Sequence, residues 1–241
     1  MRKRFRILWL LPVILMILTA GGIFYVNDYY RADPSVSAVL SEEIHGVTVS
    51  SGPDRIVFRP DEAGPGLIFY PGGKVEYTAY VPLMKALAER GIFCVLLKMP
   101  LNLAFLNVNA ADAVFSDYPE TENWYLAGHS LGGVAAALYA EKHADQLGGL
   151  ILLASYSTAN LKENRIKVLS IYGSEDGVLN RDAYEKYRSN LPEDLDEVVI
   201  PGGCHAFFGA YGEQKGDGRP GISREEQILI TAREIAAFMK K

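Results

Sequence analysis

The stretch Trp124-Tyr125-Leu126-Ala127-Gly128-His129-Ser130-Leu131-Gly132 decides the fold of this 241-residue chain. Its first four residues are apolar and predict a buried strand, and the small and apolar residues of 132–138 predict a helix. A Gly-x-Ser-x-Gly spacing between a strand and a helix is typical of a nucleophile elbow, a strained turn that exposes a serine hydroxyl. We therefore interpret Ser130 as a nucleophile. The alternative is a glycine-rich turn with an incidental serine.

Apolar runs alternate with helical patterns along most of the remaining chain. An antiparallel hairpin is predicted over 47–50 and 55–59, where Gly52-Pro53-Asp54 forms the turn. Strands are predicted at 66–70, 92–97, 123–127, 150–153, 168–172 and 197–200, and helices at 77–90, 110–117, 132–142, 181–189 and 224–239. This order predicts the α/β class, with a doubly wound, mostly parallel sheet covered on both faces. Functional residues should then follow the carboxyl ends of the strands.

A serine nucleophile needs a base, and the base needs a carboxylate that fixes its tautomer. The four histidines of the chain are His45, His129, His143 and His205, and only His205 follows the end of a predicted strand without belonging to the elbow. The matching acid is Asp176, which follows strand 168–172, and Glu175 is the alternative. Without a catalytic role, His205 would be a solvated loop residue and Asp176 a turn residue before Gly177.

Acyl transfer also needs hydrogen-bond donors for the oxyanion. The N–H of Leu131, directly after the nucleophile, is the first candidate. The second should come from the turn Pro71-Gly72-Gly73-Lys74, where glycines allow close approach of the backbone to a ligand. We choose Gly73, with Gly72 second. The alternative for these glycines is a simple turn from strand to helix.

Three motifs together resemble the α/β-hydrolase superfamily: Gly128-His129-Ser130-Leu131-Gly132-Gly133, Gly173-Ser174-Glu175-Asp176-Gly177 and Gly203-Cys204-His205. They are most similar to its small lidless branch, the dienelactone-hydrolase-like "α/β-hydrolase fold-5" proteins. The resemblance covers about 46–241 and implies the α/β-hydrolase fold, a triad in the order Ser130, Asp176, His205, and an oxyanion hole. Tyr70-Pro71 stands where the family commonly has His-Gly. Ser130 replaces the cysteine of dienelactone hydrolases proper, so their specific activity is not implied.

The site has few candidate substrate contacts outside the triad. Only residues 154–167 separate two predicted strands at the usual position of a cap, so no cap domain is expected. The loop 206–222 contains aromatic residues and is either a flap over the site or an exposed connector. Gly72, Phe207 and Lys98 are the candidate contacts to a small-molecule acyl substrate.

The N-terminus predicts a membrane anchor. Residues 1–6 carry four cations and form a basic segment, and residues 7–26 contain no charged residue, long enough for a transmembrane helix of about 30 Å. The positive-inside rule then predicts a signal-anchor at the cell membrane, single-pass, with the N-terminus cytoplasmic and the catalytic domain extracytoplasmic. A cleaved signal peptide is the alternative, with Ala20-Gly21-Gly22 as its weak cleavage site. Residues 27–45 read as a tether, and 46–241 as the α/β-hydrolase domain.

Charge and cysteine content exclude other classes. Beyond residue 26 the chain keeps all 29 acidic residues but only 20 of its 24 basic ones, a formal charge of −9, so nucleic acid is not an expected partner. Cys94 and Cys204 allow at most one disulfide. Neither a metal nor an organic cofactor is expected.

We therefore interpret the chain as a serine hydrolase of carboxylic ester, thioester or lactone bonds that works through an acyl-enzyme intermediate. A peptidase or acyltransferase would be a variant of the same chemistry. The competing class is a non-catalytic membrane-anchored interaction domain that has kept the fold.

Overall fold

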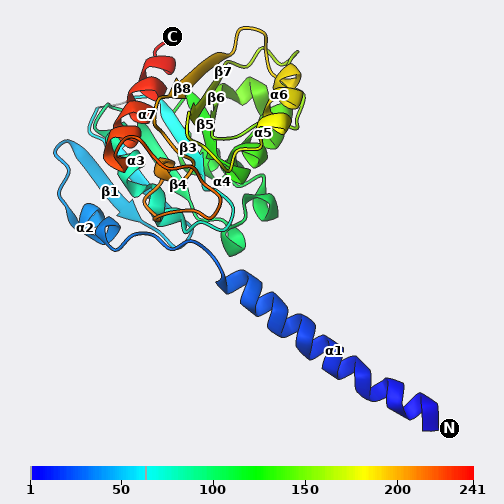
Figure 1. The fold of residues 1–241 in the computed structure, drawn as a ribbon. Coiled ribbons are helices and arrows are strands. Elements are labelled where there is room, and N and C mark those ends of the chain that lie inside the picture. Colours follow the sequence, from blue (N-terminus) through cyan, green and yellow to red (C-terminus); the bar gives the residue numbers. More distant parts are fainter. Residues whose placement is uncertain (1, 63) are drawn as a thin grey trace.

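A single mixed sheet forms the centre of the molecule (Figure 1). The computed structural model describes residues 2–62 and 64–241, with side chains from residue 12 onward. In that part of the chain the strand order is β1-β2-β4-β3-β5-β6-β7-β8. The strands are β1 (Val47–Ser51), β2 (Arg55–Pro60), β3 (Gly66–Tyr70), β4 (Phe93–Leu97), β5 (Trp124–His129), β6 (Leu147–Leu153), β7 (Val168–Gly173) and β8 (Asp196–Ile200).

The first two strands differ from the rest in direction. Strand β1 pairs with β2, and β2 with β4, in antiparallel register, whereas β4, β3, β5, β6, β7 and β8 all pair in parallel. The predicted entry hairpin and the predicted mostly parallel sheet are therefore confirmed. Residues 154–167, between β6 and β7, form no helix or strand, which leaves no cap domain there.

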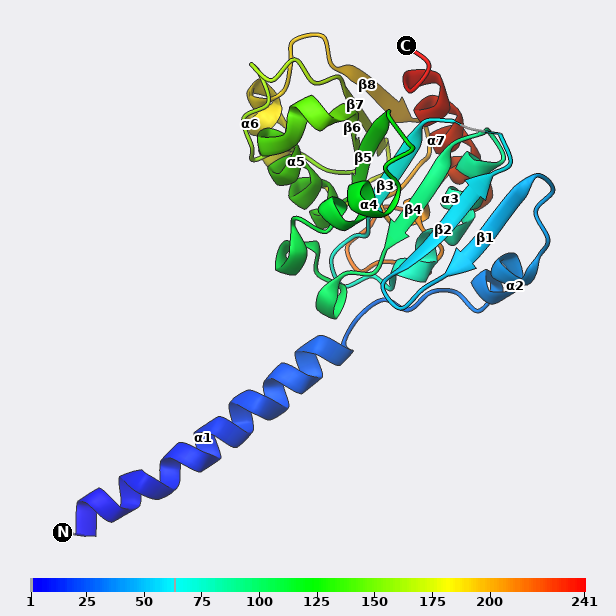
Figure 2. The same cartoon turned by 180° about the vertical axis from the view of Figure 1, so that it is seen from behind.

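Helices cover both faces of the sheet (Figures 1 and 2). Leu67 and Phe69 of β3 share one apolar cluster with residues of α3 and α7, whereas Ile68 shares the opposite cluster with residues of α4 and α5. Alternate side chains of one strand thus enter two cores, as expected for a doubly wound sheet. The helices are α1 (Arg2–Asn27), α2 (Ser35–Ser41), α3 (Val81–Ala88), α4 (Ala111–Asp117), α5 (Leu131–His143), α6 (Arg181–Tyr187) and α7 (Arg224–Phe238). Short 3₁₀ turns are η1 (Tyr77–Tyr80), η2 (Pro100–Asn102), η3 (Ala104–Asn107), η4 (Ala144–Gln146), η5 (Arg188–Asn190) and η6 (Ala206–Phe208).

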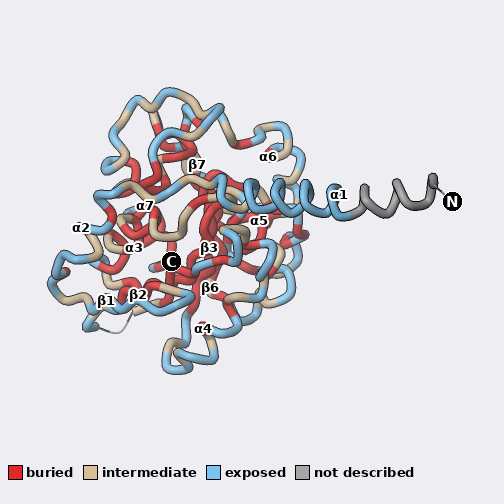
Figure 3. The backbone as a smooth tube through the Cα atoms, turned by 90° about the horizontal axis from the view of Figure 1, so that it is seen from below, coloured by how far each residue is buried: buried red, intermediate tan, exposed pale blue. Residues whose placement is uncertain are grey.

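Helix α1 projects away from the domain as a single rod (Figures 1 and 2). Viewed from below, its described part is exposed while the sheet interior is buried (Figure 3). Among the described residues, no helix combines the length and the mean hydropathy that crossing a bilayer requires. The predicted basic segment 1–6 and the first five residues of the predicted segment 7–26 lie outside the residues whose side chains are described.

The predicted tether, 27–45, is in contact with the domain over much of its length. Tyr30 forms a parallel bridge with Val75, and Val36 of α2 is buried in the main apolar cluster. The N–H of Asp33 donates to the carbonyl of Ala210 at 2.7 Å. A polar composition alone did not reveal these contacts, because the bridge to Val75 and the bond to Ala210 use backbone groups.

Candidate active site

Ser130 lies in a strained turn between β5 and α5. Its backbone has φ 51° and ψ −123°, a conformation that a non-glycine residue adopts at a cost of about 1–3 kcal/mol. The turn is held by the Ser130 N–H, which donates to the Leu153 carbonyl at 2.9 Å, and by Ser155 Oγ, which donates to the Ser130 carbonyl at 2.7 Å. A Cβ at Gly132 would overlap the carbonyl oxygens of Tyr70 and Pro71. The elbow therefore requires this glycine for steric reasons.

His205 and Asp176 form a buried pair at the ends of β8 and β7. His205 Nδ1 is 2.9 Å from Asp176 Oδ2 and 3.2 Å from Oδ1, and the carboxylate also accepts the N–H groups of Val178 and Leu179. Burial by itself would raise the pKa of Asp176, but these hydrogen bonds and the charge of His205 outweigh it, and the pKa lies below its usual value. The carboxylate therefore stays ionised and holds the Nδ1–H tautomer.

The second ring nitrogen of His205 is free to act. Nε2 is buried and has no hydrogen-bond partner among the described residues. His205 lines one small pocket together with Ser130. A nitrogen without a proton in this position can accept the proton of a serine hydroxyl.

His129, the residue before Ser130, belongs to a separate hydrogen-bond chain. The Gly72 N–H donates to Tyr80 Oη at 3.0 Å, and the same hydroxyl is hydrogen-bonded to His129 Nδ1 at 2.8 Å. Burial lowers the pKa of His129 well below its usual value, and the nearby His205 lowers it further. His129 is therefore a neutral structural group, which leaves His205 as the candidate base of the site.

The two residues expected to supply the oxyanion amides, Gly73 and Leu131, lie beside each other. A Cβ built on Gly73 would come within 3.2 Å of the Leu131 Cβ. The Leu131 N–H is in the first turn of α5, where helix amides have no partner within the helix. The amide of Gly72, our second choice, is occupied by Tyr80 Oη. Of the two glycines, Gly73 therefore remains the first candidate for the second oxyanion donor.

Asp217 was missed by sequence reasoning. One of its carboxylate oxygens accepts the N–H groups of Gly177, His205 and Gly218, at 3.1, 3.1 and 2.8 Å, and the other accepts the Ala206 N–H at 2.8 Å. It thus connects the loop of the acid to the loop of the base. An acidic residue between two glycines, Gly216 and Gly218, was the available signal, since glycines let a carboxylate approach the backbone.

Lys98 and Phe207 do not reach the pocket. That pocket has a volume of about 140 Å³. Lys98 is exposed and lies 5.9 Å from the ring of Tyr77, and Phe207 lines a separate cavity of about 330 Å³ beside Cys204. Gly72 is also outside the lining, because its turn folds toward Tyr80. The lining residues are Ser130, Leu131, Val134, Ala154, Ser155, Tyr156, Val178, Leu179, Asn180 and His205.

The loop 206–222 starts as a packed segment and not as a free flap. Phe208, Ala210 and Tyr211 are buried, and the Ala210 N–H donates to the Ala79 carbonyl at 2.7 Å. Exposed residues begin only at Gly212. A hinged flap would have to break these contacts.

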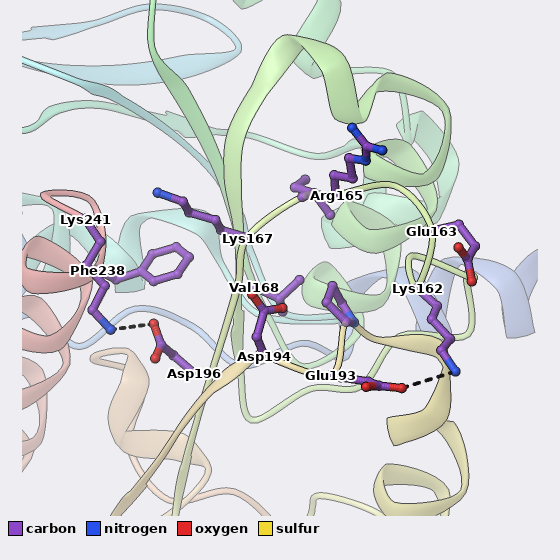
Figure 4. A pocket seen from close by; sticks show the side chains of 12 residues that line it. Lys162, Glu163, Arg165, Lys167, Val168, Glu193, Asp194, Asp196, Phe238 and Lys241 are labelled. Carbon is purple, nitrogen blue, oxygen red and sulfur yellow. Dashed lines mark hydrogen bonds and ion pairs between the residues drawn. The ribbon is translucent and has the colours of Figure 1, made fainter.

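A larger groove of about 640 Å³ lies at the opposite edge of the sheet (Figure 4). We call this the amino edge, because strands β7 and β8 begin there. Its charged side chains form surface ion pairs: Lys241 Nζ is 2.7 Å from Asp196, and Lys162 Nζ is 3.7 Å from Glu193. None of the described residues that line it is a serine, cysteine or histidine. The groove therefore lacks the serine and histidine that line the pocket at Ser130.

The chain belongs to the alpha/beta hydrolase family, whose model matches residues 66–229. This confirms the family resemblance that the three motifs predicted. No relative of curated function matches the sequence.

Solved structures with the same fold include three bacterial proteins at low identity. A membrane phospholipase A, described as a bacterial virulence factor, is 15% identical with a TM-score of 0.56, covering 96% of this chain and 97% of its own. A putative lipase from Acinetobacter baumannii is 13% identical with a TM-score of 0.61, covering 86% and 97%. Est1E from Butyrivibrio proteoclasticus is 16% identical with a TM-score of 0.58, covering 81% and 99%. These likenesses show the fold.

Proposed function

We propose that the chain is a serine hydrolase that cleaves carboxylic ester, thioester or lactone bonds. The observation that carries this proposal is the buried Asp176–His205 hydrogen bond, whose free Nε2 lies in one pocket with the strained Ser130. A non-catalytic domain would have no reason to retain a buried polar pair and backbone strain at the same place. Two of the structures with the same fold are described as a phospholipase and a lipase, which agrees with an ester substrate.

The proposed reaction has two steps, the acylation of Ser130 and the hydrolysis of the acyl-enzyme. Ser130 Oγ attacks the substrate carbonyl carbon while its proton passes to His205 Nε2. The tetrahedral oxyanion accepts hydrogen bonds from the Leu131 and Gly73 amides. When the carbon–oxygen or carbon–sulfur bond breaks, His205 returns the proton to the leaving group. Water then attacks the acyl-enzyme and gives its proton to His205. When the bond to Ser130 Oγ breaks, His205 passes this proton to Oγ, which releases the carboxylic acid and restores the serine hydroxyl.

Covalent labelling tests the nucleophile. A fluorophosphonate probe should modify the wild-type chain and should not modify Ser130→Ala, because only an activated serine attacks phosphorus at a useful rate. Ser189→Ala, in the exposed turn η5, is the control and should be labelled like the wild type, and Ser155→Ala tests the other serine that lines the pocket. Labelling that survives in Ser130→Ala and disappears in Ser155→Ala would move the nucleophile to Ser155.

We also propose that the N-terminal segment anchors the protein in the cell membrane, with the N-terminus cytoplasmic and the catalytic domain outside. Support comes from the cations of 1–6, from the uncharged stretch 7–26, and from the exposed apolar side chains of α1. The full chain should stay with membranes after alkaline carbonate washing. A reporter fused after Lys241 should be active only outside the cytoplasm. A soluble protein whose N-terminus lies near Ile23 would establish a cleaved signal peptide instead.

A further inference from the structure

Lys74 joins the end of α1 to the oxyanion turn. It directly follows Gly73, its Nζ is 2.8 Å from Asp28 Oδ2, and the same nitrogen lies 4.5 Å from the ring centroid of Tyr25 in the last turns of α1. Its carbonyl accepts the Tyr30 N–H at 2.8 Å, and the Tyr30 carbonyl accepts the Glu76 N–H at 2.9 Å. The end of α1 is thus fixed beside the catalytic pocket.

A second set of contacts fixes the same segment to the loop after the base. The rings of Tyr30 and Tyr211 lie 5.7 Å apart, the Lys215 N–H donates to Tyr30 Oη at 3.3 Å, and Asp33 pairs with Arg224 at 3.5 Å. Attachment on two sides sets the place where α1 leaves the domain. This is the carboxyl edge of the sheet, as both opposite views show (Figures 1 and 2).

Apolar side chains are exposed at this edge as well. Leu101, Phe105 and Leu106 are 53%, 44% and 55% exposed, and Leu131, in the lining of the pocket, is 45% exposed. Their loop is tied to the oxyanion turn, because the Lys74 N–H donates to the Asn102 carbonyl at 2.8 Å. Leu101 and Asn102 both have positive φ, 52° and 56°. The loop therefore bears backbone strain while it presents a leucine to solvent.

Helix α1 adds further exposed apolar side chains, and their distribution around the helix suits contact with lipid. Large apolar side chains are exposed at every position from Val13 to Leu18, so they point to all sides of the helix. A groove on a partner protein would cover one face of such a helix, whereas lipid covers all of them. The formal charge of −9 beyond residue 26 makes electrostatic attraction to anionic headgroups an unsuitable alternative.

We infer that α1, Leu101, Phe105 and Leu106 contact one lipid surface, and that the pocket at Ser130 takes its substrate, a long-chain acyl ester, directly from that surface. This inference rests on the proposed hydrolase function. The pocket volume agrees with it: about 140 Å³ is below the roughly 300–1,000 Å³ of pockets that enclose a whole small ligand. Only the ester end of a long acyl chain fits, and the rest of the chain stays in contact with lipid and with the exposed leucines.

The test compares one enzyme on two substrates. The full-length chain is mixed with phosphatidylcholine vesicles that contain 4-methylumbelliferyl oleate, and separately with soluble 4-methylumbelliferyl butyrate. The triple variant Leu101→Ser/Phe105→Ser/Leu106→Ser should lose at least about tenfold in rate on the vesicle ester and should keep kcat/KM on the soluble ester within about twofold. Retained soluble activity also establishes that the variant is folded. The single variant Phe105→Ser should show the same selectivity with a smaller loss.

The double variant Leu229→Ser/Val199→Ser is the matched control, because these side chains are similarly exposed but belong to α7 and β8. It should equal the wild type on both substrates. Equal losses in the triple and control variants, or no loss in the triple variant, would overturn the inference. Hydrolysis of the soluble ester with none of the vesicle ester would overturn it and leave the proposed function standing. Failure on both substrates, without fluorophosphonate labelling, would overturn both.

Discussion

The two edges of the sheet hold cavities of opposite character. At the carboxyl edge the pocket is small, about 140 Å³, and is lined by Ser130, which has positive φ, and by His205, whose ring pairs with the buried Asp176. At the amino edge the groove is more than four times larger, about 640 Å³, but its ion pair Lys162–Glu193 has side chains that are 49% and 89% exposed. Exposed ion pairs contribute about 0–1 kcal/mol, whereas a buried polar pair is costly unless it is precisely satisfied. Desolvation and strain, and not volume, therefore distinguish the reactive edge.

The largest effect on activity is expected from removal of the proposed base, His205, at the carboxyl edge. His205→Ala should lower kcat by about 10⁴- to 10⁶-fold, nearly as much as Ser130→Ala, because the serine then has no proton acceptor. Steady-state hydrolysis of a soluble ester measures this. His143→Ala, at the half-buried last residue of α5, is the control and should keep wild-type activity. Wild-type activity in His205→Ala would place the base elsewhere.

Loss of the acid should come next. Asp176→Asn should keep the fold and lower kcat by up to about 10⁴-fold, because an amide no longer holds the Nδ1–H tautomer of His205. Combined with His205→Ala, it should add little, since both residues act on one proton transfer. Glu175→Gln is the control. If Glu175→Gln were inactive and Asp176→Asn active, the acid would be Glu175.

A substitution of Asp217 tests whether activity at the carboxyl edge depends on how the loops of Asp176 and His205 are positioned. Asp217→Asn should lower kcat by about 10- to 100-fold with KM nearly unchanged, because an amide cannot accept all four N–H groups and the loops of acid and base would shift. The pH profile of kcat/KM should change with it. Asp196→Asn, which breaks only the surface pair with Lys241, should change neither. If Asp217→Asn lowered the thermal stability but left kcat unchanged, Asp217 would have only a structural role.

Acid titration should separate the buried carboxylate from surface ones. The pKa of Asp176 is lowered in the folded protein, so its contribution to stability is present above its unfolded pKa and is lost as pH falls through the folded value. Urea unfolding should therefore show that stability falls more steeply below about pH 4 in the wild type than in Asp176→Asn. Identical slopes would contradict the lowered pKa.

The smallest effect is expected at the amino edge. Lys162→Ala should change the free energy of unfolding by less than about 1 kcal/mol and activity by less than twofold, because the pair with Glu193 is exposed and its atoms are 3.7 Å apart. Chemical denaturation and ester hydrolysis measure the two quantities. A large loss of activity would mean that the groove takes part in function and that the contrast between the edges is wrong.

Local sequence determined the elements and the positions of three candidate site residues. Ser130 was recognisable because an elbow needs glycines at fixed spacing, and Asp176 and His205 because parallel strands bring their carboxyl ends to one edge. The uninterrupted apolar run of Leu67, Ile68 and Phe69 likewise indicated a buried strand of a sheet covered on both faces, and its side chains enter two apolar cores. These features depend on neighbours within a few residues or on the direction of a strand.

Only the tertiary structure decided which distant groups meet. Asp217 reaches Gly177 across 40 residues, and Tyr80 reaches His129 across 49. Lys98 and Phe207 follow β4 and β8 as expected, yet the first turns to Tyr77 and the second to another cavity. The attachment of Tyr30 to Lys74 uses backbone groups, which every residue carries and which leave no signal in the sequence. The sequence thus determined which residues could react, and long-range packing decided what holds them in place and which surface they face.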